Sequence, residues 1–314
     1  MKSIASAPGK IILFGEHFVV HGTPAILAAI DKRVTVTSSF TENKTIRVNS
    51  KLGTLDVPIS SSYKEVKNEF RPFVYLANKI IDSNQNANGL EITIDSDIPI
   101  GVGLGSSSAC CVAAAGSIFG LFKEWSSEEI LKISIEAEKT IFPDTSGADC
   151  TVCTYGGMIE YPSIEKIGNT FDLNLLIANS MIPHNTKNSV EKVNKFKENN
   201  EERFSQLCDL ETKLIDEVIT AMKNNDTTTF GLKMSENQKY LEEIQISNDT
   251  LRDMISYLKE ISLGTKITGA GDGGCIIALV KDENMDKVPV LLPKDKECFS
   301  AKIDTKGVEW KREK

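Results

Sequence analysis

The segment Pro99-Ile100-Gly101-Val102-Gly103-Leu104-Gly105-Ser106-Ser107-Ser108-Ala109 separates an alternating apolar run at residues 90–94, typical of a strand, from an apolar run at 108–122, typical of a buried helix. Its three glycines, two residues apart, allow backbone N–H groups to turn toward one point, where the helix N-terminus adds partial positive charge. A simple helix cap after a flexible turn would need only one serine. The segment therefore predicts a phosphate-binding loop. It is neither a Walker A loop, since no Gly-Lys-Ser/Thr ends it, nor a Rossmann motif, whose glycines are spaced differently.

Composition limits the ligands of such a loop. The chain has 314 residues, with 36 Lys+Arg against 44 Asp+Glu, a formal net charge of −8. No overall positive field exists to attract nucleic acid or an anionic membrane, so phosphate must be held locally by N–H groups, a few lysines and metal. No apolar run is long enough for a membrane helix, and the N-terminus lacks a signal-like apolar region. Seven cysteines, an odd number, fit a reduced set of thiols, so we expect a cytoplasmic protein.

Periodicity predicts an α+β protein. Strand-like runs occur at residues 11–14, 30–36, 45–48 and 90–94, interrupted by a probable helix at 70–81. Ser126 and Glu129 form a capping box that begins another helix. The second half carries helical spacing at 207–222, strand candidates at 173–177 and 275–280, and a charged, Asn-rich stretch at 197–203 that predicts a surface loop. We expect two domains, residues 1–165 and 166–314.

Two carboxylates stand out near the end of the first domain. At about 100° per residue, Glu138 falls within the apolar arc of its helix, where an unpaired carboxylate costs several kcal/mol. It either reaches solvent at the edge of the arc or binds a metal or a cationic side chain. Asp149 follows eleven residues later in the turn-rich segment 144–149, where it could cap a helix or point into a cleft.

Two further segments complete a set of groups suited to phosphoryl transfer. Lys10 precedes an apolar strand that ends in Gly15-Glu16-His17, and residues 266–275 form a second glycine-rich turn before a strand. Residues 18–20 are also strand-like, which would separate His17 from His21 and argues against a zinc site there. Carboxylate and serine oxygens suit Mg²⁺, the glycine loop suits phosphates, and a lysine with an aspartate suits an acceptor hydroxyl.

Taken together, these segments resemble the GHMP kinases, the family of galactokinase, homoserine kinase, mevalonate kinase and phosphomevalonate kinase, and most closely the mevalonate kinases. The resemblance rests on the segments Ala7-Pro8-Gly9-Lys10 with Phe14-Gly15-Glu16-His17, the loop 101–109, Thr145-Ser146-Gly147-Ala148-Asp149, a segment at Thr186, and Thr268-Gly269-Ala270-Gly271. It spans nearly the whole chain. It implies an N-terminal domain like ribosomal protein S5 domain 2, a ferredoxin-like C-terminal domain, and ATP between them.

The resemblance also implies roles for individual residues. Catalysis would depend on Asp149 and Lys10, and Mg²⁺ would be bound by Ser107 and Glu138. The ATP-binding residues would be Ser96, Gly101, Val102, Gly103, Leu104, Gly105, Ser106, Ser107 and Gly271. Mevalonate would be surrounded by Lys10, Glu16, His17, Asp149 and Thr186.

The implied activity is Mg²⁺- and ATP-dependent phosphorylation of the 5-hydroxyl of (R)-mevalonate in isoprenoid biosynthesis. Alternatives are a mevalonate 3-kinase, a phosphomevalonate kinase, a sugar kinase, or a non-catalytic ligand sensor of the same family. Retention of both Lys10 and Asp149 argues against the 3-kinase, and retention of all the candidate catalytic groups argues against the sensor. The oligomeric state stays open, a homodimer included.

The chain departs from the common family pattern at four positions. Ser108 stands where relatives often have Ala, Thr145 where they have Pro, Cys150 where they have Asn, and Asp272 where they have Gly or an apolar residue. None of these side chains is expected to touch a proposed catalytic group, and Asp272 is expected to add negative charge near a phosphate-facing turn.

Overall fold

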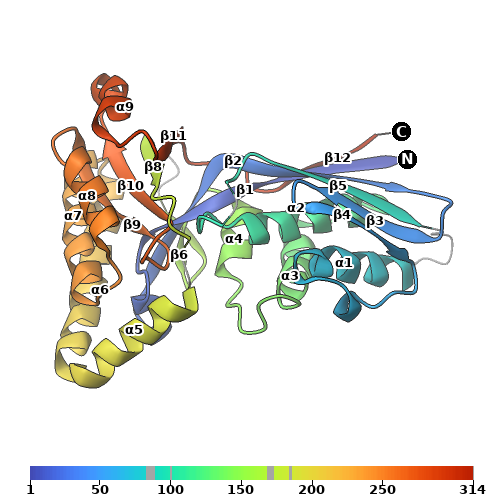
Figure 1. The fold of residues 1–314 in the computed structure, drawn as a ribbon, viewed down its shortest axis with the longest axis horizontal. Coiled ribbons are helices and arrows are strands. Elements are labelled where there is room, and N and C mark those ends of the chain that lie inside the picture. Colours follow the sequence, from blue (N-terminus) through green and yellow to red (C-terminus); the bar gives the residue numbers. More distant parts are fainter. Residues whose placement is uncertain (83–88, 100, 168–172, 184–185, 314) are drawn as a thin grey trace.

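The computed structural model describes residues 1–82, 89–99, 101–167, 173–183 and 186–313. Two β-sheets carry the fold, and Figure 1 shows helices α1–α4 along one face of the first sheet and α6–α8 on the outer side of the second. This arrangement confirms the predicted α+β class.

The first sheet has the strand order β12-β1-β2-β5-β3-β4, and β6 continues it by pairing with both β2 and β7. Every pair is antiparallel except β3 with β5. The strands are β1 (Lys2–Phe14), β2 (Ala25–Phe40), β3 (Thr45–Ser50), β4 (Gly53–Pro58), β5 (Leu90–Ser96), β6 (Met158–Tyr161), β7 (Glu165–Ile167) and β12 (Glu309–Glu313). The predicted strands are present but longer, because sheet pairing extends each of them beyond its apolar run.

Four helices cover this sheet: α1 (Arg71–Asp82), α2 (Ser106–Gly120), α3 (Ser127–Glu138) and α4 (Ala148–Tyr155). Helix α2 lies against β1 and β2 and between the other helices, so nearly all of its residues are buried, as its uniformly apolar sequence predicts. The predicted capping box begins α3, with the Ser126 hydroxyl accepting from the Glu129 N–H and the Glu129 carboxylate accepting from the Ser126 N–H.

The second sheet has the antiparallel order β11-β8-β10-β9, formed by β8 (Leu175–Asn179), β9 (Ser262–Thr268), β10 (Cys275–Val280) and β11 (Glu297–Ala301). The helices of this half are α5 (Thr186–Asn199), α6 (Glu201–Lys223), α7 (Thr227–Glu243), α8 (Asp249–Leu258) and the short α9 (Val288–Leu291). Along α6, Leu207, Leu214, Val218 and Met222 are buried, whereas Leu210 faces solvent. No helix of the described part of the chain is both long and apolar enough to cross a membrane.

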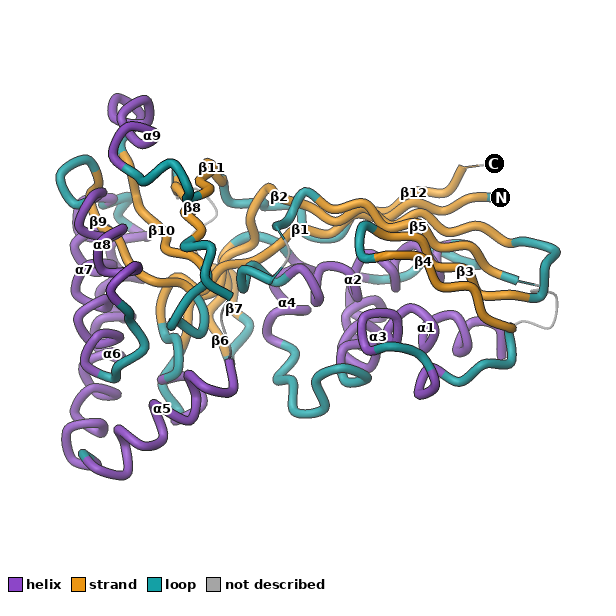
Figure 2. The backbone as a smooth tube through the Cα atoms, in the orientation of Figure 1, coloured by secondary structure: helices purple, strands orange, loops and turns teal. Residues whose placement is uncertain are grey.

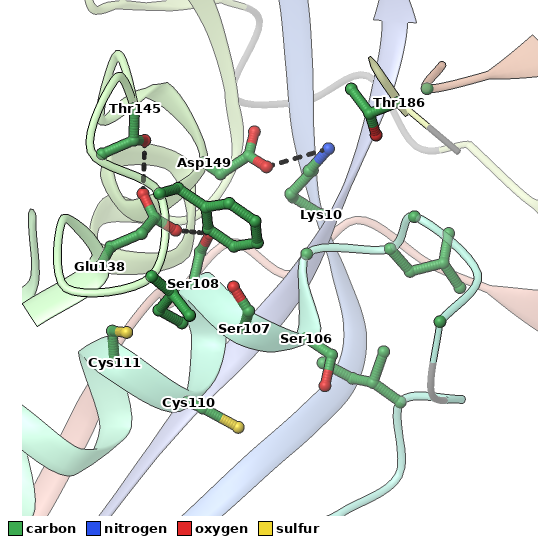
Figure 3. Close-up of a pocket in the computed structure, with 18 of the residues that line it drawn as sticks. Lys10, Ser106, Ser107, Ser108, Cys110, Cys111, Glu138, Thr145, Asp149 and Thr186 are labelled. Carbon is green, nitrogen blue, oxygen red and sulfur yellow. Dashed lines mark hydrogen bonds and ion pairs between the residues drawn. The ribbon is translucent and has the colours of Figure 1, made fainter. Parts of the chain in front are cut away.

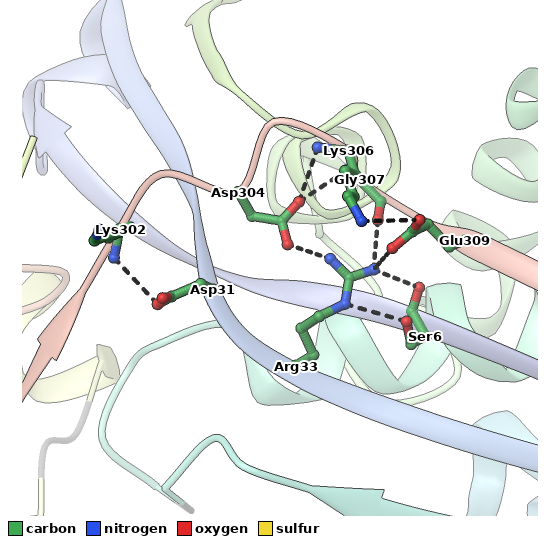
Figure 4. A network of polar contacts seen from close by, with 8 residues as sticks. All are labelled: Ser6, Asp31, Arg33, Lys302, Asp304, Lys306, Gly307 and Glu309. Atoms are coloured by element: carbon green, nitrogen blue, oxygen red, sulfur yellow. Dashed lines mark hydrogen bonds and ion pairs between the residues drawn. The ribbon is translucent and has the colours of Figure 1, made fainter. Parts of the chain in front are cut away.

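The C-terminal strand does not stay with the second domain. As Figure 2 shows, the chain returns after β11 and runs as β12 along β1, so residues 309–313 join the first sheet although the sequence assigned 166–314 to the second unit. Arg33 on β2 holds the returning segment: its guanidinium pairs with Asp304 and donates to the Gly307 carbonyl at 2.6 Å (Figure 4). The boundary near residue 165 stays a prediction.

Two local predictions are wrong. Residues 197–203 are helical except at Asn200, because the Asn200 amide donates to the Phe196 carbonyl and Arg203 pairs with Glu243 on α7, so tertiary contacts offset a poor helix sequence. Phe18–His21 form the 3-10 turn η1 and not a strand, since Gly15 and Gly22 on either side have positive φ angles and turn the chain.

Candidate active site

A cavity of about 890 Å³ lies between β1 and β5 of the first sheet, the N-termini of α2 and α4, the start of α5 and the second glycine turn. It gathers side chains from both halves of the chain. The predicted site residues that line it are Lys10, Glu16, His17, Ser96, Gly101, Val102, Gly103, Leu104, Gly105, Ser106, Ser107, Glu138, Asp149 and Thr186. Gly271 is the exception.

The first glycine loop has the left-handed backbone that its sequence predicts. Gly101, Gly103 and Gly105 have φ angles of 75°, 82° and 71°. At Gly105 a side chain is also excluded by space, because a Cβ there would lie 2.6 Å from the Lys10 Cγ. The loop is tied to β1 by the Lys10 N–H, which donates to the Leu104 carbonyl at 2.9 Å. The loop thus holds Lys10 beside the N-terminus of α2.

Lys10 and Asp149 meet in this cavity (Figure 3). The Lys10 Nζ lies 3.1 Å from an Asp149 carboxylate oxygen, although the two side chains come from β1 and from the first turn of α4. The Lys10 side chain is 7% exposed and that of Asp149 is 36% exposed. The lysine therefore lies deep in the site, while the carboxylate stays open to a ligand in the cavity.

Glu138, at the C-terminal end of α3, is 3% exposed. One of its oxygens accepts from the Ser108 hydroxyl, and the other accepts from the Thr145 hydroxyl at 2.6 Å (Figure 3). Two of the departures from the family pattern, Ser108 and Thr145, thus contact the expected metal ligand Glu138. The position of Glu138 within the apolar arc of its helix is confirmed by its burial.

The other end of the cavity is formed by His17, Glu16 and Thr186. His17 Nε2 lies 2.9 Å from the Ala270 carbonyl oxygen, which can only accept, so Nε2 carries the proton. Burial lowers the pKa of His17, more than the Ala270 carbonyl raises it, which leaves the ring neutral near pH 7 with Nδ1 as an acceptor. His21 points elsewhere and packs edge-on against Phe204, so the two histidines do not converge.

Glu16 belongs to a buried polar network that the sequence did not indicate. Its Oε1 pairs with the Lys266 Nζ, both side chains being fully buried, while its Oε2 has no hydrogen-bond partner among the described residues. Glu211 on α6 extends the network by accepting from the Gly15 N–H at 2.9 Å. Lys266 and Glu211 gave no sequence signal, because a single charged residue in a strand or an amphipathic helix is normally exposed.

The second glycine turn reaches the cavity through Gly269 and Ala270 but not Gly271. A Cβ at Gly271 would lie 2.4 Å from the Ile246 carbonyl oxygen, so this glycine permits close backbone packing. The carboxylate of Asp272 forms an ion pair with Lys192 on α5, the two atoms 2.7 Å apart. The negative charge expected at this turn is therefore offset by a lysine.

Comparisons with known proteins confirm the two-domain GHMP kinase fold and show the family of the chain. Residues 71–157 match the family model of the GHMP kinases N terminal domain, and residues 218–288 match that of the GHMP kinases C terminal. The chain is 34% identical over 305 residues to a mevalonate kinase of Thermococcus sibiricus, covering 91% of both chains. It is also 34% identical over 282 residues to one of Archaeoglobus fulgidus, covering 89% of this chain and 93% of the relative. The crystal structure of the Methanococcus jannaschii mevalonate kinase superposes with a TM-score of 0.85 at 29% identity, over 96% of this chain and 98% of that one.

Proposed function

We propose that this chain, which belongs to the mevalonate kinases of the GHMP kinase family, transfers the γ-phosphoryl group of ATP to the 5-hydroxyl of (R)-mevalonate. The observation that carries the proposal is the Lys10–Asp149 pair, which opens into the same cavity as the glycine loop 101–105. The product is 5-phosphomevalonate, an intermediate of isoprenoid biosynthesis. The seven free cysteines suit a reducing compartment, and we assign the enzyme to the cytoplasm.

The glycine loop and the N-terminus of α2 supply the phosphate-binding part. Left-handed glycines allow successive N–H groups to face the cavity, and the helix dipole adds positive potential at Ser106 and Ser107. These neutral donors bind polyphosphate without a cluster of basic residues. Ser96, at the end of β5, lines the same cavity and would contact the nucleotide.

The residues at the α2 and α3 ends fit Mg²⁺. This cation takes oxygen ligands, commonly one or two carboxylates completed by substrate phosphates and water. Glu138 offers a buried carboxylate and Ser107 a hydroxyl that no protein group bonds in the described part of the chain. The described residues contain no cluster of three or more His, Cys, Asp or Glu side chains suited to a metal, so phosphates would have to complete the site. When bound, Mg²⁺ would neutralise charge on the β- and γ-phosphates.

The part of the cavity formed by His17, Glu16 and Thr186 can bind an alcohol substrate. The neutral His17 offers Nδ1 as an acceptor, and the fully buried Glu16, which pairs with Lys266, supports the wall of the cavity behind it. Thr186, the first residue of α5, adds a hydroxyl. A substrate with several hydroxyl groups could hydrogen-bond to both His17 and Thr186.

The transfer step follows from the position of Asp149. The acceptor oxygen bonds to the γ-phosphorus as the bond to the β–γ bridging oxygen breaks, and ADP leaves. Asp149 orients the hydroxyl and accepts its proton, or passes it to the transferred phosphate, because a loose phosphoryl transition state needs little base strength. The Lys10 ammonium lies beside that carboxylate and stabilises negative charge on the transferring group.

The substrate is tested by an assay of ADP release with mevalonate, phosphomevalonate, galactose and homoserine in parallel. We expect turnover with mevalonate and a product phosphorylated at the 5-hydroxyl, identified by phosphorus NMR. A 3-phosphate would indicate a mevalonate 3-kinase. If only one of the other compounds is turned over, that compound and not mevalonate is the substrate. If the protein binds nucleotide but turns over none of the four, it is a sensor.

A further inference from the structure

The carboxylate of Glu138 is held by two neutral hydroxyl groups. Ser108 donates from α2 to Oε1, and Thr145 donates to Oε2 from the loop between α3 and α4, as the dashed lines in Figure 3 show. In the described part of the chain no lysine, arginine or histidine lies within ion-pair distance of this carboxylate. A buried carboxylate normally pairs with a cation, whereas the described residues offer Glu138 only hydroxyl partners.

We propose that Ser108 and Thr145 are positioning residues that fix the Glu138 carboxylate for a divalent cation bound together with ATP at Ser107, an inference that rests on the proposed kinase function. With both oxygens hydrogen-bonded, rotation of the carboxylate about its terminal bond is restrained. Outer hydrogen bonds of this kind orient metal ligands and raise metal affinity by about 10–100-fold. The metal then supplies the positive charge that no protein side chain provides.

Two neighbouring serines of α2, Ser107 and Ser108, have different roles in this arrangement. Ser108 is buried and donates toward α3, whereas its neighbour Ser107 lies at the cavity surface. Successive residues of a helix point about 100° apart, so one hydroxyl can hold the carboxylate while the other meets the ligand. The pair places the expected ligand Ser107 and the expected ligand Glu138 on the same side of the cavity.

Thr145 connects Glu138 to the catalytic aspartate. Its hydroxyl oxygen donates to Glu138 and accepts from the Gly147 N–H at 3.2 Å. Gly147 is the residue before α4, whose first turn carries Asp149. A single hydroxyl thus joins the metal-binding carboxylate to the turn that presents the group facing the acceptor, so the cation site and the acceptor site share one support.

The test measures how much Mg²⁺ strengthens binding of a non-hydrolysable ATP analogue, by calorimetry with Mg²⁺ and with EDTA. In S108A and in T145V we expect this gain in affinity to fall by about tenfold or more. T145S keeps a hydroxyl and should restore the gain. S134A is the matched control, since it removes a buried hydroxyl on α3 that donates to the Ile130 carbonyl and not to Glu138. This variant should show the same Mg²⁺-dependent increase in affinity as the wild type.

Each outcome decides the matter. If Mg²⁺ increases the affinity of S108A and T145V for the ATP analogue as much as it does in the wild type, whatever their loss of thermal stability, the hydroxyls only satisfy a buried carboxylate. Larger gains would show that they compete with the metal, which also overturns the proposal. Since Thr145 is only partly buried, T145V keeps the test usable where S108A folds poorly. A wild-type protein without any Mg²⁺ gain would instead overturn the proposed metal-dependent kinase function, and with it this inference.

Discussion

Glu211 makes stability depend on pH in a direction that can be measured. Its side chain is fully buried on α6, where Oε1 accepts from the Gly15 N–H and Oε2 from the Asn237 amide at 2.7 Å. Burial, and then the charge of the nearby Glu16, raises its pKa from 4.5 to about 7, although the hydrogen bond from Asn237 and the charge of Lys266 act in the opposite direction. At a pH between these two values, the Glu211 carboxyl is therefore protonated in the folded protein and ionised in the unfolded chain.

The magnitude follows from linkage. A pKa raised from 4.5 to about 7 means that the folded state binds the proton more tightly by about 2.5 pH units, which is worth about 3 kcal/mol. This stabilisation is fully present below the unfolded pKa and is lost as the pH rises through the folded pKa. Between about pH 5 and pH 8 the loss is about 2–3 kcal/mol.

The variant E211Q removes this titration and keeps the shape of the side chain. The carbonyl of a glutamine at this position can accept from the Gly15 N–H. If the side-chain amide of Asn237 flips, the glutamine amide can donate to the Asn237 Oδ1, a buried acceptor that has no partner in the described part of the chain. Urea unfolding of wild type and E211Q from about pH 5 to pH 8 gives the comparison. As the pH rises over this range, the free energy of unfolding of the wild type should fall by about 2–3 kcal/mol more than that of E211Q. E201Q, which removes an exposed carboxylate of α6, should behave as the wild type. Parallel curves for wild type and E211Q would refute the assignment of a buried, protonated Glu211.

D149N should lower kcat by about 10²–10⁴-fold with nearly unchanged affinity for ATP, as steady-state kinetics and nucleotide titration would show, because the group facing the acceptor is lost while the glycine loop is intact. E138Q should shift the Mg²⁺ titration of the rate to higher concentrations, and an unchanged titration would return Glu138 to a structural role. G105A should lose more activity than G101A: both residues have positive φ, but only at Gly105 would a Cβ meet the Lys10 stem, whereas at Gly101 it would meet open space. Equal activity in the two variants would mean that the loop does not position Lys10.

Features set by local geometry could be predicted from the sequence. The capping box fixed the start of α3, and projection at about 100° per residue then placed Glu138 on the buried side of the helix, because both depend only on residues within a few turns. The glycine loop was predictable for the same reason: glycine is the residue that adopts positive φ without strain.

Features set by contacts between distant segments could not be predicted. Phe18–His21 has β-branched and aromatic residues typical of a strand, yet glycines at either end and the packing of Phe18 against Phe204 make it a turn. The hydrogen bond from Ser108 to Glu138 joins residues thirty positions apart on two helices, and only their packing brings the two groups together. Similarly, Lys266 gives no local sign of being fully buried.

Three acids in or beside the site form ion pairs with lysines, which limits the repulsion that an acidic chain exerts on a polyphosphate ligand. Asp149 pairs with Lys10, Glu16 with Lys266, and Asp272 with Lys192, so these carboxylates add little repulsion toward ATP. Glu138 differs, since only hydroxyl groups bond it among the described residues. A net charge of −8 therefore need not oppose nucleotide binding. Among these four acids, Glu138 alone has no cationic side chain beside it in the described part of the chain, and it is the acid that we propose shares a divalent cation with the phosphates.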